Sequence, residues 1–223
     1  MPVESRDWGI REYLPSLEAM RAMRAQRARG EIADTLILVE HPPVVTVGVQ
    51  GSDGEPLPPG IPVVSVERGG KGTYHGPGQL VGYPIVDLEP RGRDVRRFVS
   101  DVEELLIRSI AEVGVTGERV TGRRGVWVAG ARKIASVGIA VESWVTFHGF
   151  ALNVDVDLGA FRAFHPCGFP GSVMTSVSQE LGNPVSTEAM RPPVLRAWDR
   201  IFGGSAVSPT PVRPSSALAP LPR

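Results

Sequence analysis

The sequence contains one cysteine, Cys167, and its surroundings favour a chemical role over a structural one. Cysteine is among the most buried residue types and usually acts as a small apolar side chain. Here it lies in H-P-C-G-F-P-G, where prolines and glycines predict an irregular turn. Reactive residues are found disproportionately on such loops, and a neighbouring glycine exposes the backbone N–H groups that an acyl-transfer oxyanion needs. We interpret Cys167 as a candidate nucleophile.

A thiol nucleophile at neutral pH needs a nearby base or a lowered pKa. The candidate bases are His165, His75, His148 and Lys133. His165 shares a face with Cys167 only if the segment is extended, which Pro166 permits but does not require. A lysine also suits the role, because its ammonium stabilises a thiolate and then passes a proton to the leaving group. The residues alone leave this choice open.

Lysine is scarce in this chain. Of the 24 basic residues only two are Lys, at positions 71 and 133. A guanidinium stays protonated in proteins, whereas an ammonium can lose its proton when it is buried or beside a thiol. Positions that keep Lys are therefore candidates for proton transfer, although the survival of two surface lysines by chance explains the count equally well.

The densest cluster of polar and flexible residues is R-G-G-K-G-T-Y-H-G-P-G-Q at 68–79, in which five of twelve residues are glycine. Glycines let the backbone approach a ligand closely and leave N–H groups free to bind an oxygen. The segment matches neither the G-x-x-x-x-G-K-[ST] nor the G-x-G-x-x-G phosphate-binding pattern. Gly-rich stretches are often only loops with unusual turns, but the interleaved polar side chains favour a binding loop.

Composition excludes several classes of protein. Basic and acidic residues both number 24, so the net charge does not suggest nucleic acid or a membrane surface as partner. No apolar run approaches the roughly 20 residues of a membrane span, and residues 1–10 lack the features of a signal peptide. A cytoplasmic protein is the simplest expectation, and a single cysteine fits a reducing compartment. One Cys and four scattered His give no metal-ligand spacing, so we expect no metal.

Hydrophobic periodicity and Gly/Pro punctuation predict one α+β domain over residues 1–202, with local strand pairing, and a flexible Pro/Ser/Ala-rich tail over 203–223. The predicted helices are 16–29, 94–113 and one within 190–202 that starts near Pro192. The predicted strands are 35–40, 44–48, 63–67, 80–88, 125–128, 134–141 and 150–156, with an exposed loop at 51–62.

The motifs together resemble those of the lipoyl(octanoyl) transferase family. They are R-G-G-x-x-T-Y-H-G-P-G-Q-L-V-G-Y-P-I at 68–85, G-V-W-V at 125–128, K-I-A-S-V-G at 133–138, W-V-T-F-H-G-F-A-L-N-V at 144–154, and P-C-G followed by V-x-T-S at 173–176. The resemblance covers about 35–181 and keeps the family's order. Lys71-Gly72 replaces the more usual Gln-Val, and His165 stands where an apolar residue is common, so a contribution of His165 to tuning Cys167 stays open.

The resemblance implies a mixed or antiparallel sheet flanked by helices, as in biotin-protein and lipoate-protein ligases. It implies transfer of octanoyl from octanoyl-acyl carrier protein to a lysine of lipoyl domains, in 2-oxoacid dehydrogenase complexes and glycine cleavage H protein, without a cofactor. Cys167 matches the acyl-thioester cysteine, and Lys133 matches the lysine that acts as acid and base. The segments that match the family's acyl site contain Arg68, Gly69, Gly70, Lys71, Gly72, Thr73, Tyr74, His75, Ser136, Val137, Gly138, Gly149, Phe150 and Ala151. We expect Tyr74, Val137 and Phe150 to form the apolar slot for the acyl chain.

Two other functions are compatible with these residues. An ATP-dependent lipoate or biotin ligase on the same fold would form an acyl-adenylate and need no nucleophilic cysteine. A non-catalytic protein that binds acyl groups or lipoyl domains would use Cys167 only for packing. A requirement for ATP and a covalent acyl adduct distinguish the three.

Overall fold

The computed structural model describes residues 3–51, 60–163 and 169–203. Cys167 and His165 lie outside the described residues, as does the predicted tail from residue 204 onward. The helices described contain no segment with both the length and the apolar character needed to cross a membrane.

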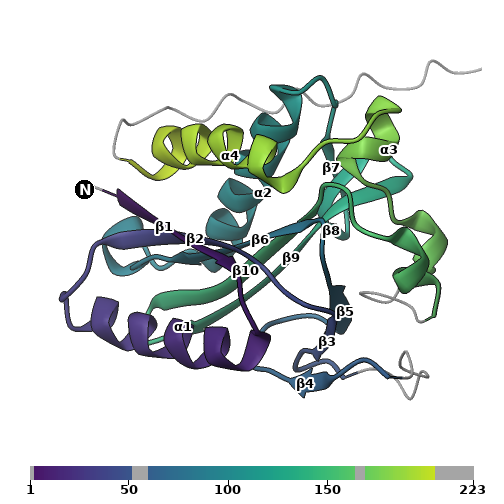
Figure 1. Cartoon of the computed structure of the whole chain (residues 1–223). Helices are drawn as coiled ribbons and strands as arrows, with labels where there is room; N and C mark the ends of the chain where they lie inside the picture. Colours follow the sequence, from purple (N-terminus) through teal and green to yellow (C-terminus); the bar gives the residue numbers. More distant parts are fainter. Residues whose placement is uncertain (1–2, 52–59, 164–168, 204–223) are drawn as a thin grey trace, which may run out of the picture.

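A seven-stranded mixed sheet forms the centre of the molecule (Figure 1). Its strand order is β1-β2-β6-β10-β9-β8-β7, with β1 parallel to β2 and the other pairs antiparallel. In that order the strands are Val3–Ile10, Asp34–Glu40, Gln79–Ile85, Val145–Asn153, Arg132–Glu142, Arg123–Val128 and Glu118–Val120. The α+β prediction with a mixed sheet flanked by helices is confirmed.

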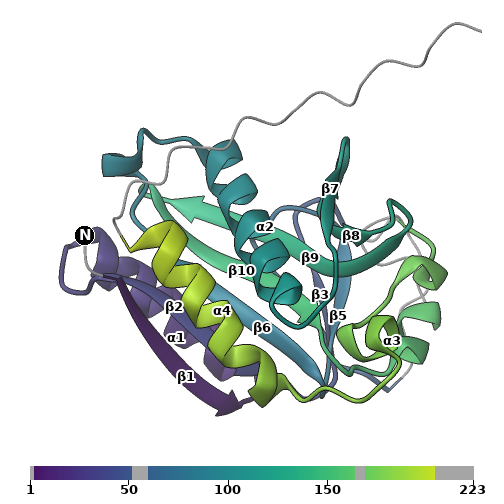
Figure 2. The same cartoon turned by 90° about the horizontal axis from the view of Figure 1, so that it is seen from above.

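Helices cover both faces of the sheet. On one face, α2 (Val95–Ala111) and α4 (Thr187–Phe202) lie side by side, and α1 (Tyr13–Ala28) covers the other (Figures 1 and 2). Each face has its own apolar core, one built with α2 and α4 and one with α1. Helix α2 forms because its apolar residues repeat on one face and Asp94 accepts a hydrogen bond from the N–H of Arg97 at 2.9 Å.

A second, three-stranded sheet stands at one end of the main sheet (Figure 1). Its order is β4 (Val63–Ser65), β3 (Val44–Val47) and β5 (Gly72–His75). Strand β5 lies inside the Gly-rich segment and β6 begins at its last residue, Gln79, so the prediction that 68–79 is a loop is wrong for these five residues. A short helix, α3 (Val177–Leu181), follows the β-bridge between Lys133 and Met174.

Most predicted elements are present with shifted ends, and β1, β7 and α3 were not predicted. The start of the last helix near Pro192 is wrong, because α4 begins at Thr187 and contains Pro192 and Pro193. Each proline removes one backbone hydrogen bond within the helix. The Ser186 hydroxyl caps the N-terminus at 3.2 Å from the N–H of Ala189, and a buried face with Trp198 packs on α2. Tertiary packing therefore outweighs the local signal.

A buried carboxylate ties the two faces of the domain together. Asp34, at the start of β2, is 1% exposed and accepts a hydrogen bond from Arg27 of α1 at 2.9 Å. It also accepts from Arg91 at 3.0 Å and from the backbone N–H of Asp87 at 3.0 Å. Arg91 in turn donates to the carbonyl of Phe202 at the end of α4. One side chain thus fixes both helix layers to the sheet.

Asp34→Asn is expected to lower the free energy of unfolding by about 3 kcal/mol, because two guanidinium groups lose their buried counter-charge while the side-chain shape is kept. Urea denaturation followed by circular dichroism measures the change. Glu31→Gln removes an exposed ion pair with Arg29 and serves as the control, which should leave the midpoint nearly unchanged. Equal midpoint shifts in the two variants would contradict this role for Asp34.

Candidate active site

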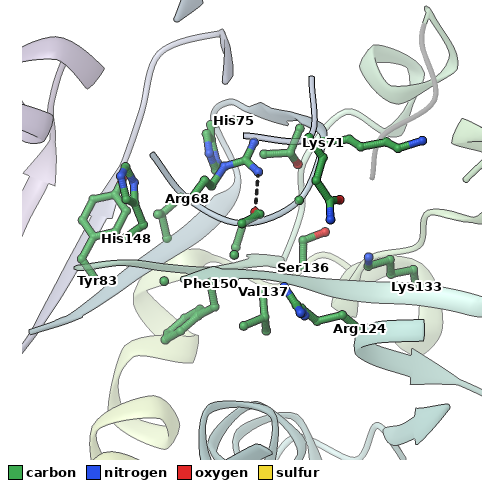
Figure 3. Close-up of a pocket in the computed structure, with 18 of the residues that line it drawn as sticks. Arg68, Lys71, His75, Tyr83, Arg124, Lys133, Ser136, Val137, His148 and Phe150 are labelled. Carbon is green, nitrogen blue, oxygen red and sulfur yellow. Dashed lines mark hydrogen bonds between the residues drawn. The ribbon is translucent and has the colours of Figure 1, made fainter. Parts of the chain in front are cut away.

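A pocket of about 260 Å³ lies between the Gly-rich segment and strands β9, β10 and β6 (Figure 3). The segment 68–75 forms one wall, and the strands form the opposite wall. The described residues that line it are Tyr13, Gln50, Arg68, Gly69, Gly70, Lys71, Thr73, His75, Val81, Tyr83, Gly122, Arg124, Lys133, Ser136, Val137, Gly138, His148, Gly149, Phe150, Ala151 and Phe169.

The Gly-rich wall is fixed by a buried arginine. The guanidinium of Arg68 donates to the carbonyl of Thr46 at 2.7 Å and to its hydroxyl at 2.8 Å, and Arg68 is 7% exposed. The N–H of Gly69 donates to the carbonyl of Ile139 on β9 at 3.0 Å. A Cβ on Gly138 would lie 3.0 Å from the carbonyl oxygen of Gly69. The two walls therefore approach each other through backbone, which is why glycine is required there.

A β-bulge places Lys133 on the pocket side of the sheet. Across β8 and β9, Val126 pairs with Ala135 but Trp127 pairs with Lys133, so Ile134 is an extra residue in β9. Ile134 and Ala135 both belong to the core on the α2 and α4 side. Side chains alternate strictly in a regular strand, so Lys133 would then share the face of Ala135. The bulge turns the amine to the other face, where it lines the pocket.

The side chain of Lys133 is almost fully enclosed. The residue is 2% exposed, and its Nζ lies 5.5 Å from the ring centre of Trp127 and 5.3 Å from that of Phe169. Such cation–π contacts contribute about 0.5–2 kcal/mol each. A Cβ on Gly125 would lie 3.0 Å from Lys133 Cε and even closer to the carbonyl oxygen of Ala135. The aliphatic part of Lys133 thus occupies space that a side chain at position 125 would take.

A hydrogen-bond chain connects the pocket to the backbone of Lys133. The Gln79 amide donates to the Asn153 side-chain oxygen at 3.0 Å and to the Tyr74 carbonyl at 3.2 Å, so its oxygen accepts from Nδ1 of His75 at 2.8 Å. Asn153 donates to the carbonyl of Thr175 at 2.9 Å. The N–H of Thr175 donates to the carbonyl of Lys133 at 2.9 Å. This chain assigns His75 the tautomer with its proton on Nδ1.

The histidines and tyrosines at the inner end of the pocket are neutral at pH 7. Burial, and to a lesser extent the nearby His41, lowers the pKa of His75 to about 3. Burial also lowers the pKa of His148 to about 4, although its contact with Glu67 opposes the shift. Burial raises the pKa of Tyr13, whose ring stacks on His75 with centres 5.9 Å apart. The guanidinium of Arg68 also lies at this end, beside His75, whereas Arg124 and Lys133 lie on the strand wall (Figure 3).

Twelve of the fourteen predicted substrate-site residues line the pocket, and Gly72 and Tyr74 do not. Tyr74 packs against Phe161 with ring centres 5.5 Å apart, because its side chain points into a separate apolar cluster. The side chains of Val137 and Phe150 belong to the core on the α2 and α4 side and point away from the pocket in Figure 3. The three side chains therefore do not form one apolar slot together, because Tyr74 lies outside the pocket while Val137 and Phe150 line it and also pack into that core.

Several lining residues were not predicted. His148 was considered only as a base, and Tyr83 lies in the recognised motif L-V-G-Y-P-I without having been chosen. Phe169 follows P-C-G by one residue, so its position near a reactive cysteine was the available signal. Tyr13 comes from the start of α1, and nothing in the local sequence pointed to it. Among the described residues, no group of three His, Cys, Asp or Glu could hold a metal ion.

Solved structures with a similar fold include a lipoate-protein ligase and a biotin protein ligase. The crystal structure of lipoate-protein ligase A bound with ATP superposes with a TM-score of 0.71, covering 91% of this chain and 86% of that chain at 16% identity. Biotin protein ligase from Aquifex aeolicus gives a TM-score of 0.51 over 90% of this chain and 69% of that one, at 8% identity. By fold, the chain has the catalytic-domain architecture of these ligases.

Sequence comparison gives the family. The model for the lipoyl protein ligase A/B catalytic domain matches residues 12–199, and the chain belongs to that family. An octanoyltransferase from Geobacter metallireducens is 49% identical over 180 residues, covering 81% of this chain and 84% of the relative. An octanoyltransferase from Mycobacterium bovis is 46% identical over 198 residues, covering 87% and 85%.

Gly125→Ala is expected to lower turnover about 100-fold, the size of effect that follows a misplacement of about 1 Å. The added methyl group must displace the Lys133 side chain or the β9 backbone. Gly130→Ala is a matched control in the same hairpin, because both glycines have positive φ, 105° and 65°, but a Cβ at 130 meets only Glu118 Oε1 at 3.9 Å. The measurement is steady-state turnover per folded protein. Equal losses of turnover in both variants would contradict the steric explanation.

The neutral histidines make stability depend on pH. His41, His75 and His148 have pKa values lowered to about 4, 3 and 4, whereas unfolded histidine titrates near 6.5. Below pH 6.5 the unfolded chain binds protons that the folded chain does not, so stability is complete above 6.5 and is lost as pH falls toward 4. His148→Gln should reduce this slope by up to about 1.4 kcal/mol per pH unit. Urea titrations between pH 7.5 and 4.5 measure it, and parallel curves would contradict the assignment.

Proposed function

We propose that this chain is an octanoyltransferase that moves octanoyl from octanoyl-acyl carrier protein to a specific lysine of lipoyl domains. The observation that carries the proposal is the enclosed amine of Lys133, which opens onto a pocket bounded by the Gly-rich segment and by Phe169. An enclosed lysine beside an acyl-sized cavity is suited to proton transfer at a reacting carbonyl. The identity of the acyl group, octanoyl, is inferred from the octanoyltransferase relatives.

Cys167 is the proposed nucleophile, although it lies outside the described residues. Phe169 follows it by two residues and lies in the pocket wall, 5.3 Å from Lys133 Nζ. This nearness of Phe169 to the amine supports the proposed pairing of the Cys167 thiol with Lys133, and the contribution of His165 is left to experiment.

The proposed reaction proceeds in two steps. The Cys167 thiolate attacks the thioester carbonyl, the bond to the carrier sulfur breaks, and the Lys133 ammonium protonates the departing thiolate. The neutral amine of the acceptor lysine then attacks the acyl-enzyme, the bond to the Cys167 sulfur breaks, and Lys133 takes the proton from the new amide nitrogen. The cycle returns a thiolate and an ammonium, so the charges balance without ATP or metal.

The pocket walls supply binding and charge stabilisation. Backbone N–H groups of the Gly-rich segment and of the turn that carries Cys167 are the proposed donors to the oxyanion. The inner part of the pocket lined by Val81, Ala151 and Tyr13 is the proposed place for the acyl chain. Proposed acceptors are lipoyl domains of 2-oxoacid dehydrogenase complexes and glycine cleavage H protein, in the cytoplasm.

An ATP-dependent ligase is the alternative function on this fold. Structural neighbours of low identity support the fold alone, whereas relatives at 41–49% identity over at least 80% of this chain are octanoyltransferases. The octanoyl transfer is therefore the better-supported function. The two reactions differ in their need for ATP and for a cysteine.

Incubation with octanoyl-acyl carrier protein is expected to add one octanoyl group that hydroxylamine removes, as measured by intact mass. Cys167→Ala should show no adduct and no transfer to a lipoyl domain. Lys133→Arg keeps the charge but cannot shuttle a proton, so transfer should fall at least about 100-fold, within the range for general acid–base catalysis. Activity that requires ATP and survives in Cys167→Ser would establish the ligase instead, and full activity in Lys133→Arg would reject the shuttle.

A further inference from the structure

Trp127 is a buried aromatic residue that does not serve an apolar core. It is fully buried, yet it belongs to none of the three apolar clusters that the described residues form. Its ring instead contacts two cations, the guanidinium of Arg123 at 5.4 Å and the Lys133 amine at 5.5 Å from the ring centre. Its indole N–H donates to the carbonyl of Arg123 at 3.1 Å, which fixes the ring plane.

The same ring contacts the residue that follows P-C-G. The Phe169 ring meets the Trp127 ring edge-on, with centres 5.1 Å apart and planes at 79°. Lys133 Nζ lies 5.3 Å from the Phe169 ring centre. Trp127, Phe169 and Lys133 therefore form a triangle in which every pair is in contact.

The segment after Phe169 is attached to Lys133 at its other end as well. Met174 forms a β-bridge with Lys133, and the Thr175 N–H donates to the Lys133 carbonyl at 2.9 Å. The segment 169–175 is thus held around Lys133 at two points, through side chains at Phe169 and through backbone at Thr175. The first point depends on the Trp127 ring, because the bulge pairs Trp127 with Lys133 across the strands.

We infer that Trp127 is a positioning residue for the reaction, which holds the segment 169–175 against the Lys133 amine through the Phe169 ring. The inference rests on the proposed function. It assigns Trp127 no contact with the reacting atoms. Its expected effect is on the thiol and on turnover rather than on substrate affinity.

The test uses the fact that this sequence contains a single cysteine. The rate of alkylation by iodoacetamide as a function of pH gives the titration midpoint of Cys167 directly. In Trp127→Leu the midpoint is expected to rise by about 1 pH unit or more, because an ammonium within a few ångströms lowers a thiol pKa by that amount. Turnover should fall at least about 10-fold with KM changed less than about threefold. Trp127→Phe keeps a ring and should recover most of both.

Trp198→Leu is the matched control. Trp198 is equally buried and its indole N–H also donates to a carbonyl at 3.1 Å, that of Glu4, but it packs on Phe202 in the α2 and α4 core. This variant should lower the melting temperature without changing the pH midpoint of Cys167 alkylation. Phe169→Leu removes the same contact between the Trp127 and Phe169 rings. It provides the test if Trp127→Leu does not fold. The double variant should shift the midpoint no further than Trp127→Leu alone.

The outcomes separate this inference from the proposed function. If the wild-type chain forms the octanoyl adduct but Trp127→Leu and Phe169→Leu leave the midpoint and turnover unchanged, the positioning role is overturned and the transferase is not. If Trp198→Leu moves the midpoint as much as Trp127→Leu, the effect is general destabilisation and the inference is also overturned. A wild-type chain with no adduct rejects the proposed function itself.

Discussion

The active site depends on one extra residue in β9. Strand geometry gives side chains a period of two, so Lys133, Ala135 and Val137 would share a face in a regular strand. That face is the core under α2 and α4, where an ammonium would be buried among apolar side chains at a large cost. The bulge at Ile134 changes the alternation once, between Trp127 and Val126 on the partner strand. Lys133 then faces the pocket while its neighbours 134 and 135 both stay in the core. The β-bulge at Ile134 therefore keeps the apolar core intact and also directs the Lys133 amine to the pocket.

The pocket exists because two backbone surfaces approach each other without side chains between them. Gly138 on β9 faces Gly69, and a Cβ on Gly48 would collide with the carbonyls of Arg68 and Gly70. Arg68 fixes this arrangement by donating to Thr46 from inside the protein. The Gly-rich segment is thus held rigidly by a neighbouring sheet, because β5 pairs with β3. A binding loop of this composition would otherwise have high conformational entropy.

The sequence predicted the elements whose signal is local. Helix α2 and strand β2 have a clear hydrophobic pattern, and the resemblance placed Lys133, Arg68 and His75 in one site. Other features arise only from tertiary structure. The face on which Lys133 lies depends on the bulge, Pro192 lies inside α4 because packing outweighs its missing hydrogen bond, and Val137 lines the pocket although it belongs to the core. Tyr13 reaches the pocket from a helix over 50 residues away from the Gly-rich segment, which no local pattern encodes.

Charge is distributed along the pocket in a way that matches the proposed chemistry. Toward Tyr13, Tyr83 and His148 the histidines and tyrosines are neutral, since burial lowers the pKa of each histidine and raises the pKa of each tyrosine. The guanidinium of Arg68 lies near them and donates its hydrogen bonds to Thr46. Toward Phe169 the enclosing groups are cationic, with Lys133 and Arg123 both against the Phe169 ring. A fatty acyl chain is most stable against uncharged side chains, and a thiolate or oxyanion close to cations. For the proposed reaction, this arrangement favours a thioester whose carbonyl lies next to the amine. Preorganisation of this kind lowers the barrier most when the charged groups are held fixed, so the aromatic contacts around Lys133 and the bulge that aims it serve the same purpose.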